Sequence, residues 1–409
     1  MTDSRRYAAA TALDRRGLLA ATAALAGTAA LPFRARAADM PLKLGLCLEY
    51  TGGSSGTTSE SVQFGVDLAL ATLNAGNGIA GRKITRIIAD TQTDATVGVG
   101  EMKRLVQQEK VDFVIGPVIS QIELAAAPVL NAANIASFGS TGSLAITPAV
   151  APYYFSTLVS AAAQANKMAS HAAQALHARS GAIISDSGAQ AKDFVQNMRR
   201  EMQAAGIKLT GVQEYQYRAI DMTPQLLALK HARPDTLFLF ASSGEDAGNV
   251  IKSLGDVGWN PPVTGNWTLG TFVDAMEKVC GAAALENVTG SNYAGFTYCA
   301  GGAQPQPYLD FVARAKQFNG GPAARLSLTM AALFHDAVML FKAAVEGSGG
   351  RTDGATVAAW VERNGASFRG IAGPVAPSKE SHFLYGPDAL AVVHPARRGE
   401  AGIQERVAC

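Results

Sequence analysis

The sequence contains little cysteine and histidine, with four cysteines and six histidines in 409 residues. No two cysteines form a C-x-x-C pair, and none stands at zinc-ligand spacing from a histidine. His171 and His177 are six positions apart, so they do not share the helix face that a metal-binding i, i+4 pair requires. These absences argue against a metal site.

The sequence also lacks the glycine-rich motifs that hold nucleotide phosphates. No G-x-G-x-x-G follows an expected strand, and the glycine-rich segment 52–56 has no Lys-Ser/Thr after its last glycine. We therefore expect no nucleotide and no other cofactor.

An excess of charge of one sign is missing as well. Residues 1–37 hold six of the 35 basic and two of the 33 acidic side chains, which leaves 29 basic and 31 acidic side chains in the rest. Without a basic cluster, binding to nucleic acid or to an anionic membrane surface is not expected. The balance fits a protein that binds small molecules.

Long apolar runs are scarce, and the clearest one, at 18–31, lies near the N-terminus. A twin arginine at 15–16 precedes it and an A-x-A cleavage pattern at 35–37 follows it, which is typical of a twin-arginine export signal. A membrane anchor is the alternative, but the run is interrupted and shorter than the ~20 residues that a span needs. We expect residues 1–37 to be removed near Ala37, a periplasmic location, and no later membrane span.

Short apolar runs alternate with segments of helical periodicity along the rest of the chain. Strands are expected at 42–48, 84–89, 113–115, 135–138, 182–185, 209–215 and 236–240. Helices are expected at 59–75, 97–108, 121–132, 161–178, 190–205, 223–231, 245–257, 306–318, 327–345 and 355–364. This order predicts two open α/β domains with parallel sheets covered on both faces. A β-like tail at 381–393 is expected to belong to a C-terminal part that returns to finish both sheets.

The cleft between two such domains is the expected binding site, because ligands bind at the carboxyl ends of strands in open α/β sheets. Ser120 follows the strand at 113–115 and stands near a helix N-terminus, where backbone N–H groups favour an anion. The alternative is that Ser120 is an ordinary N-cap. Ser140 and Thr141 lie in a polar loop at the same sheet edge, and ordinary turn chemistry is their alternative.

Several segments resemble one known family. They are LNAGNGIAG at 73–81, VIGP at 114–117 with Ser120 behind it, and FRGIAGPV at 368–375. In this order they are similar to the type I periplasmic binding proteins of the leucine/isoleucine/valine type, over about residues 42–395.

The resemblance implies two doubly wound lobes joined by a three-segment hinge. The N-terminal lobe is expected at 38–156 plus 291–372, and the C-terminal lobe at 157–290 plus 373–409. It also implies a monomer that closes on a small polar ligand and delivers it to the permease of an ABC importer, without catalysis.

The residues that the resemblance places at the ligand are Ser120, Ser140, Thr141, Thr58, Gln190, Ser243 and Trp267. Amino-acid binders of the family carry an acid for the ligand's ammonium where this chain reads Thr264-Gly265-Asn266-Trp267-Thr268. The ligand is therefore a branched-chain or related amino acid, or an aromatic or other carboxylate or an amide that lacks the amine. Glu245 or Asp246 is a substitute for the missing acid, or else a first-turn helix residue.

A serine hydrolase is the alternative of another class, because Gly52-Gly53-Ser54-Ser55-Gly56 matches G-x-S-x-G, with His382 or His394 as partners. The match follows the first strand and precedes the helix by several residues, unlike a nucleophile elbow.

Export would place the cysteines in an oxidising compartment. Cys280 and Cys299, 19 residues apart, are then a possible disulfide. Cys47 lies in an apolar run and is expected to be buried.

Overall fold

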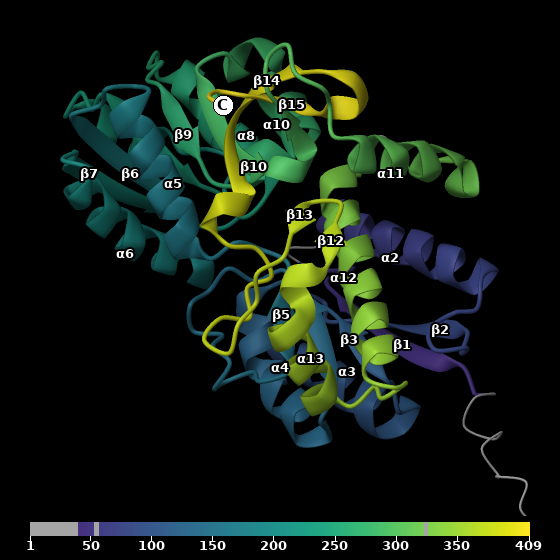
Figure 1. Cartoon of the computed structure of the whole chain (residues 1–409). Coiled ribbons are helices and arrows are strands. Elements are labelled where there is room, and N and C mark those ends of the chain that lie inside the picture. Colours follow the sequence, from purple (N-terminus) through teal and green to yellow (C-terminus); the bar gives the residue numbers. More distant parts are fainter. Residues whose placement is uncertain (1–39, 53–56, 323–325) are drawn as a thin grey trace, which may run out of the picture. The chain divides into compact units, whose positions relative to one another are not determined.

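Two main β-sheets with helices on both faces make up residues 42–409, which form one compact unit (Figure 1). The computed structural model describes residues 40–52, 57–322 and 326–409. The expected export signal and Ser54 lie outside the described residues.

The first sheet is five-stranded, with the order β2-β1-β3-β4-β5, and all of its strands are parallel. Its strands are β1 (Leu42–Leu48), β2 (Ile84–Asp90), β3 (Phe113–Ile115), β4 (Ala136–Gly139) and β5 (Tyr154–Ser156). Side chains of β1 alternate between two apolar layers: Leu44 and Leu46 pack with α2 (Thr57–Ala75) and α12 (Leu328–Gly347). Cys47 packs on the other face with α3 (Ala95–Lys103), the π-helical turn Arg104–Glu109 and α4 (Ser120–Ala133).

The α12 helix is the core helix of the first sheet. A Cβ atom on Gly65 of α2 would lie 2.0 Å from the carbonyl oxygen of Ala331, so the two helices pack backbone against backbone. Among the described helices, α12 is long and apolar enough to cross a membrane, which corrects the expectation that no segment after residue 37 would be. Because 72% of its apolar window is buried, its hydrophobicity is explained by packing inside the protein.

The second sheet is eight-stranded, with the order β11-β15-β14-β10-β9-β8-β6-β7. Its strands are β6 (Ser180–Asp186), β7 (Lys208–Tyr215), β8 (Thr236–Phe240), β9 (Val263–Gly265), β10 (Val288–Tyr293), β11 (Thr297–Tyr298), β14 (Leu390–Arg398) and β15 (Gln404–Arg406). One face packs on α5 (Ala161–Gln174) and α6 (Ala189–Ala204). The other face packs on α7 (Thr223–Lys230), α8 (Gly244–Asp256), α9 (Thr268–Thr271) and α10 (Val273–Cys280).

The sequence had led us to expect that the C-terminal part adds strands to both sheets, and this expectation is wrong for the first sheet. The five strands of the first sheet come from residues 42–156, and the returning chain adds to it a single parallel β-bridge between Phe383 and Ser156. The returning chain contributes helices to it, α12 and α13 (Gly354–Asn364), whereas β14 and β15 join the eight-stranded sheet. The returning chain also forms the helix α11 (Gln306–Gln317). It contains a short antiparallel pair of strands as well, β12 (Arg369–Gly370) and β13 (Gly373–Pro374).

The expected disulfide between Cys280 and Cys299 is not formed, because Cys299 is bonded to Cys409. The pairing of β11 with β15 brings the C-terminus beside Cys299. Cys280 ends α10 as a free thiol that donates to the carbonyl oxygen of Met276 at 3.2 Å. Cys47 is free and buried, as expected.

Candidate functional site

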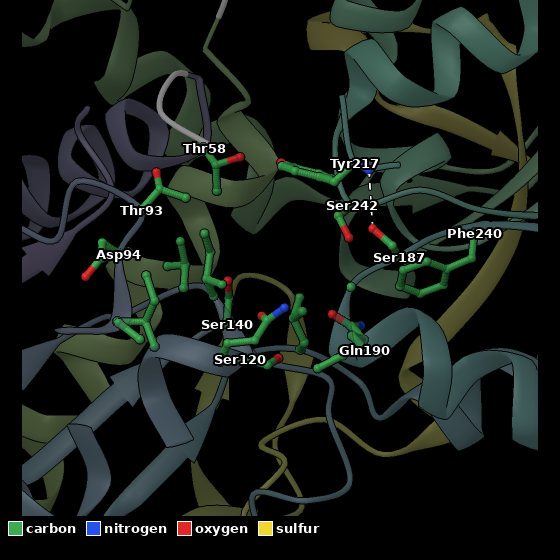
Figure 2. A pocket seen from close by; sticks show the side chains of 18 of the residues that line it. Thr58, Thr93, Asp94, Ser120, Ser140, Ser187, Gln190, Tyr217, Phe240 and Ser242 are labelled. Carbon is green, nitrogen blue, oxygen red and sulfur yellow. Dashed lines mark hydrogen bonds between the residues drawn. The ribbon is translucent and has the colours of Figure 1, made fainter. Parts of the chain in front are cut away.

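A pocket of about 440 Å³ lies where the carboxyl ends of strands from both sheets meet. Its volume is in the range of small-molecule sites. Loops and helix N-termini line it, and Figure 2 shows most of the side chains. The lining residues are Thr58, Thr93, Asp94, Ala95, Val118, Ile119, Ser120, Gln121, Ile122, Ser140, Leu158, Ser187, Gly188, Ala189, Gln190, Tyr217, Phe240, Ser242 and Trp267.

Ser120 is the first residue of α4, and its side chain lies in the pocket wall with 5% of the residue exposed. The N-cap position belongs to Ile119, which offers no capping side chain. The alternative that Ser120 is itself the N-cap is therefore wrong, and no side-chain cap closes this helix N-terminus toward the pocket. A hydroxyl beside an uncapped N-terminus suits an anionic ligand.

The turn before α4 depends on Gly116, which has φ = 91° and is followed by a cis peptide bond to Pro117. A Cβ atom on Gly116 would lie 2.0 Å from the carbonyl oxygen of Cys47. This close approach excludes any larger residue and fixes the path by which β3 leads into the pocket wall.

Ser140 and Thr141 separate in the structure. Ser140 lines the pocket, whereas Thr141 does not. The hydroxyl of Tyr154 donates to the Thr141 Oγ1 at 3.0 Å and accepts from the Thr141 N–H at 3.2 Å. Ser156 also donates to the Thr141 carbonyl oxygen at 2.6 Å. These bonds turn Thr141 into a support of the loop that presents Ser140.

A second support holds the loops after β1 and β2. The Asp90 carboxylate accepts from the Thr51 hydroxyl at 2.6 Å and from the N–H groups of Tyr50 and Gln92. Partial burial acts to raise the pKa of Asp90, but these hydrogen bonds outweigh it and lower the pKa. Thr93 is thus carried by a loop that an ionised carboxylate ties to the segment after β1, whereas Thr58 is the second residue of α2.

On the side of the eight-stranded sheet, Asp186 ties two loops in the same way. Its carboxylate accepts from the N–H of Gly188 at 2.9 Å and of Ser242 at 2.7 Å. Burial raises the pKa of Asp186. Ser187 accepts a bond from the N–H of Tyr217 at 3.4 Å. In Figure 2 the Tyr217 hydroxyl points toward Thr58, across the space between the two walls.

Gln190 and Trp267 complete this wall. The Gln190 side chain packs on Gly142, where a Cβ atom would lie 2.0 Å from the Gln190 Nε2, and this amide nitrogen is buried without a hydrogen-bond partner among the described residues. Trp267 is 7% exposed and packs edge-on against Phe272, with 5.6 Å between the ring centroids. Its backbone N–H donates to the side-chain oxygen of Gln164. Both side chains present neutral groups to the pocket.

The pocket contains five of the seven residues expected at the ligand, namely Thr58, Ser120, Ser140, Gln190 and Trp267. Ser243 is not among them, because it caps α8 by accepting from the N–H of Asp246 at 3.1 Å, and its neighbour Ser242 lines the pocket instead. Tyr217, Ser187 and Thr93 were missed. Each directly follows or nearly follows a strand, which is the signal that would have found them.

Charge is scarce among the lining residues, since Asp94 is their one charged side chain. Asp94 caps α3 by accepting from the N–H of Val97 at 2.9 Å, and in Figure 2 its carboxylate lies at the margin of the site. Neither Glu245 nor Asp246 lines the pocket. Asp246 is 1% exposed, accepts from the N–H of Arg218 at 3.2 Å, and has a pKa that burial raises to about 6.

Comparisons with known proteins place this geometry in a family. Residues 41–398 match the periplasmic binding protein family. Leu/Ile/Val-binding protein homolog 7 of Brucella abortus is 24% identical over 262 residues, or 61% of this chain and 65% of that protein. The chain spans less than two thirds of the length of the curated relatives it matches.

Solved structures agree in fold. The branched-chain amino acid transporter substrate-binding protein LivJ of Streptococcus pneumoniae, in complex with isoleucine, has a TM-score of 0.73 at 19% identity, covering 90% of this chain and 99% of its own. A solute-binding protein of an ABC transporter from Rhodopseudomonas palustris, in complex with 3,4-dihydroxybenzoic acid, has a TM-score of 0.75 at 21% identity, covering 90% and 95%. The family consists of ligand-binding proteins and not of enzymes. The chain thus belongs to the periplasmic binding protein family, as its resemblance to the leucine/isoleucine/valine-binding type predicted.

Proposed function

We propose that this protein is the extracytoplasmic solute-binding component of an ABC importer and that it captures a small carboxylate without an ammonium group. The observation that carries the ligand class is the composition of the pocket. Hydroxyl groups and an uncapped helix N-terminus suit a carboxylate, while aromatic and neutral polar side chains line the opposite wall. An aromatic carboxylate fits both walls.

This pocket offers an ammonium group few charged or hydrogen-bonding partners. Burying it without a charged or hydrogen-bonding partner costs several kcal/mol, and the one lining carboxylate, Asp94, already caps a helix at the margin. Trp267 lies in the segment where amino-acid binders of the resembled family carry their acid. These observations favour the ligand class of the Rhodopseudomonas neighbour, which was solved with 3,4-dihydroxybenzoic acid.

A branched-chain or related amino acid is the second candidate. The Brucella relative is named as a Leu/Ile/Val-binding protein, and the Streptococcus neighbour was solved with isoleucine. In that case Asp94 would have to turn from its capping bond toward the ligand.

Binding is proposed to close the two lobes about a hinge, which the permease then recognises as the loaded form. The crossings expected from the sequence are near 156/157, 290/291 and 372/373. We place the second crossing after Tyr298, because β11 still pairs with β15 in the eight-stranded sheet up to that residue. At the third crossing, Asp336 of α12 accepts from the N–H groups of Ile371 and Ala372 at 2.6 and 3.2 Å, which ties this segment to the core helix.

A thermal-shift screen tests the ligand class, with benzoate, 4-hydroxybenzoate, 3,4-dihydroxybenzoate, isoleucine, leucine, short carboxylates and amides as probes. A ligand present at 100 times its Kd adds about 2.7 kcal/mol of stability. We expect stabilisation by the aromatic acids. Stabilisation by leucine or isoleucine alone would refute the amine-free ligand. Scattering curves of equal compactness with and without the winning ligand would contradict closure.

Residues 1–37 are proposed to direct export to the periplasm, and the mature protein is proposed to be a monomer that meets the permease there. N-terminal sequencing of the periplasmic protein should begin near residue 38. An intact Met1 in that fraction would disprove cleavage.

A further inference from the structure

Two fully buried carboxyl groups stand directly behind the pocket wall that comes from the five-stranded sheet. Glu49 follows β1, and Glu123 is in the first turn of α4, next to the lining residues Gln121 and Ile122; both glutamates are 0% exposed. Neither carboxyl forms a hydrogen bond with any of the described residues. Groups of this kind are rare, because an unpaired charge in such a place is strongly unfavourable.

The contacts of the two glutamates lead to the ligand side of the wall. Burial raises the pKa of Glu49, and the backbone N–H groups of Glu49 itself, Val118 and Ile119 partly offset that effect; Val118 and Ile119 also line the pocket. Glu123 acts on Tyr154, whose hydroxyl holds Thr141 and through it the loop of Ser140. The charge state of Glu49 and Glu123 therefore changes the electrostatic potential at the place where we expect the ligand's carboxylate.

The charged groups that act on the two glutamates are acidic. Asp90 of β2 acts on Glu49, and the two glutamates act on the Cys47 thiol of β1. Glu49 also raises the pKa of Glu123.

The elements packed on α4 carry Lys103 on α3 and Lys192 on α6, and both lysines are exposed. Among the described residues, the charge that acts on the buried Glu123 is that of Glu49. On the α3 side, Arg104 is bonded to Glu101 and Glu109. On the α6 side, Asp193 accepts from the Ser143 hydroxyl at 2.6 Å and from the Leu144 N–H at 2.9 Å.

Burial therefore brings the pKa values of both acids close to physiological pH, so that both are largely neutral at about pH 6 and ionise as the solution becomes alkaline. Desolvation raises the pKa of Glu49 to about 7 and, with the charge of Glu49, that of Glu123 to about 8. A ligand carboxylate in the pocket would add a negative charge to this region, which raises both pKa values further.

We propose that Glu49 and Glu123 form a proton-holding pair behind the anion site, so that a carboxylate ligand is bound together with a proton from solvent. This inference rests on the proposed carboxylate ligand and adds its regulation by pH. Linkage makes the effect reciprocal: a proton on the pair favours the ligand, and the ligand favours the proton. Affinity should be constant at acidic pH and fall in alkaline solution.

The test is calorimetric titration of the full mature chain with 4-hydroxybenzoate and with benzoate. Between about pH 6 and pH 8.5, the Kd should rise with pH. For the uptake of one proton, the rise approaches about tenfold per pH unit once the pair is ionised in the free protein. Repeating the titration in buffers of different ionisation enthalpy counts that proton directly. Glu123→Gln and Glu49→Gln keep the shape but cannot ionise, so each should flatten the profile, and Glu286→Gln, an exposed carboxylate, should not.

The outcomes separate the two proposals. Binding with no proton taken up at any pH would overturn the pair while leaving the ligand class intact, even if both glutamine variants failed to fold. An unchanged pH slope in folded Glu123→Gln and Glu49→Gln would do the same. If no carboxylate bound at about pH 6, where the pair is neutral, the carboxylate ligand itself would be wrong and the proton uptake with it.

Discussion

The two walls of the pocket differ in what they offer a ligand. The wall from the five-stranded sheet has a fixed backbone, with Gly116 in a left-handed conformation, an uncapped α4 and the hydroxyls of Ser120 and Ser140. The wall from the eight-stranded sheet has side chains of varied chemistry, with Tyr217 and Trp267 among them. The first wall is suited to one feature that many ligands share, and the second to the features that distinguish them.

The supports behind the walls differ as well. Behind the first wall, Asp90 accepts four hydrogen bonds at its ionised carboxylate, from Tyr50, Thr51 twice and Gln92. Behind the second wall, Asp186 and Asp246 are buried carboxyl groups whose pKa values are raised. This difference teaches that an ionised carboxylate joins the loops of the first wall, whereas the carboxyl groups that join the loops of the second wall are ones whose ionisation burial makes unfavourable.

The largest expected effect concerns the frame of the eight-stranded sheet. Cys409→Ser removes a disulfide that closes a separation of 110 residues, and the loss should lower the free energy of unfolding by about 2–5 kcal/mol. Ligand affinity should change less than about twofold, because the bond lies in the C-terminal hairpin and not among the lining residues. Chemical denaturation and calorimetry measure the two quantities, with Cys280→Ser as the matched control for loss of a free thiol.

The next effect tests the anchor in the first wall. Ser120→Ala should weaken all carboxylate ligands by about 1.5–3 kcal/mol, because it removes a hydroxyl that donates to a charged group. That is roughly a ten- to hundredfold rise in Kd. Ser242→Ala is the matched control in the second wall, and its effect should depend on the ligand. Equal losses for every ligand in both variants would abolish the distinction between the walls.

Much of this frame was predictable from the sequence because it depends on local patterns. The strands Leu42–Leu48, Phe113–Ile115 and Thr236–Phe240 fall where the apolar runs predict them. The helix expected at 161–178 ends at Gln174, since His177 adopts a left-handed conformation for which the alanine-rich sequence gives no signal.

The predictions that failed concern residues whose partners are far away in the sequence. Cys299 and Cys409 meet only because β11 and β15 pair, and no spacing reveals that pairing. In the site, Ser120 was found from a strand followed by a helix start, which is a local pattern. Thr141 was expected at the pocket but lies behind its lining, because it is held by Tyr154, which comes from another strand.

A smaller effect separates the supports of the two walls by the sign of their pH dependence. Burial raises the pKa of Asp246 to about 6. Between about pH 4 and pH 6 the unfolded chain loses this proton before the folded chain does, so stability falls as pH rises through that window. Asp246→Asn should remove the loss and stabilise the protein above pH 6 by roughly 1–2 kcal/mol, with no gain near pH 4.

Asp90 should behave in the opposite way. Its pKa is lowered in the folded protein, so its contribution is present above its usual pKa and is lost as pH falls through the lowered value. Asp90→Asn should therefore destabilise the protein at neutral pH. Denaturation curves across this pH range check both variants, and the same sign for both would contradict the contrast between the supports.

The smallest effect is a change in ligand preference through the second wall. Gln190→Glu has nearly the same shape, and it converts a buried amide without a described partner into a carboxylate near the N-terminus of α6, where negative charge is favoured. The new acid offers an ammonium partner that the pocket lacks and repels a second anion. The ratio of the Kd for isoleucine to the Kd for 4-hydroxybenzoate should fall by about fivefold, or ~1 kcal/mol. Gln121→Glu adds the same charge to the first wall on an exposed side chain and is the control. If Gln121→Glu changed the ratio as much as Gln190→Glu, any nearby charge would suffice, and selectivity would not reside in the wall of the eight-stranded sheet.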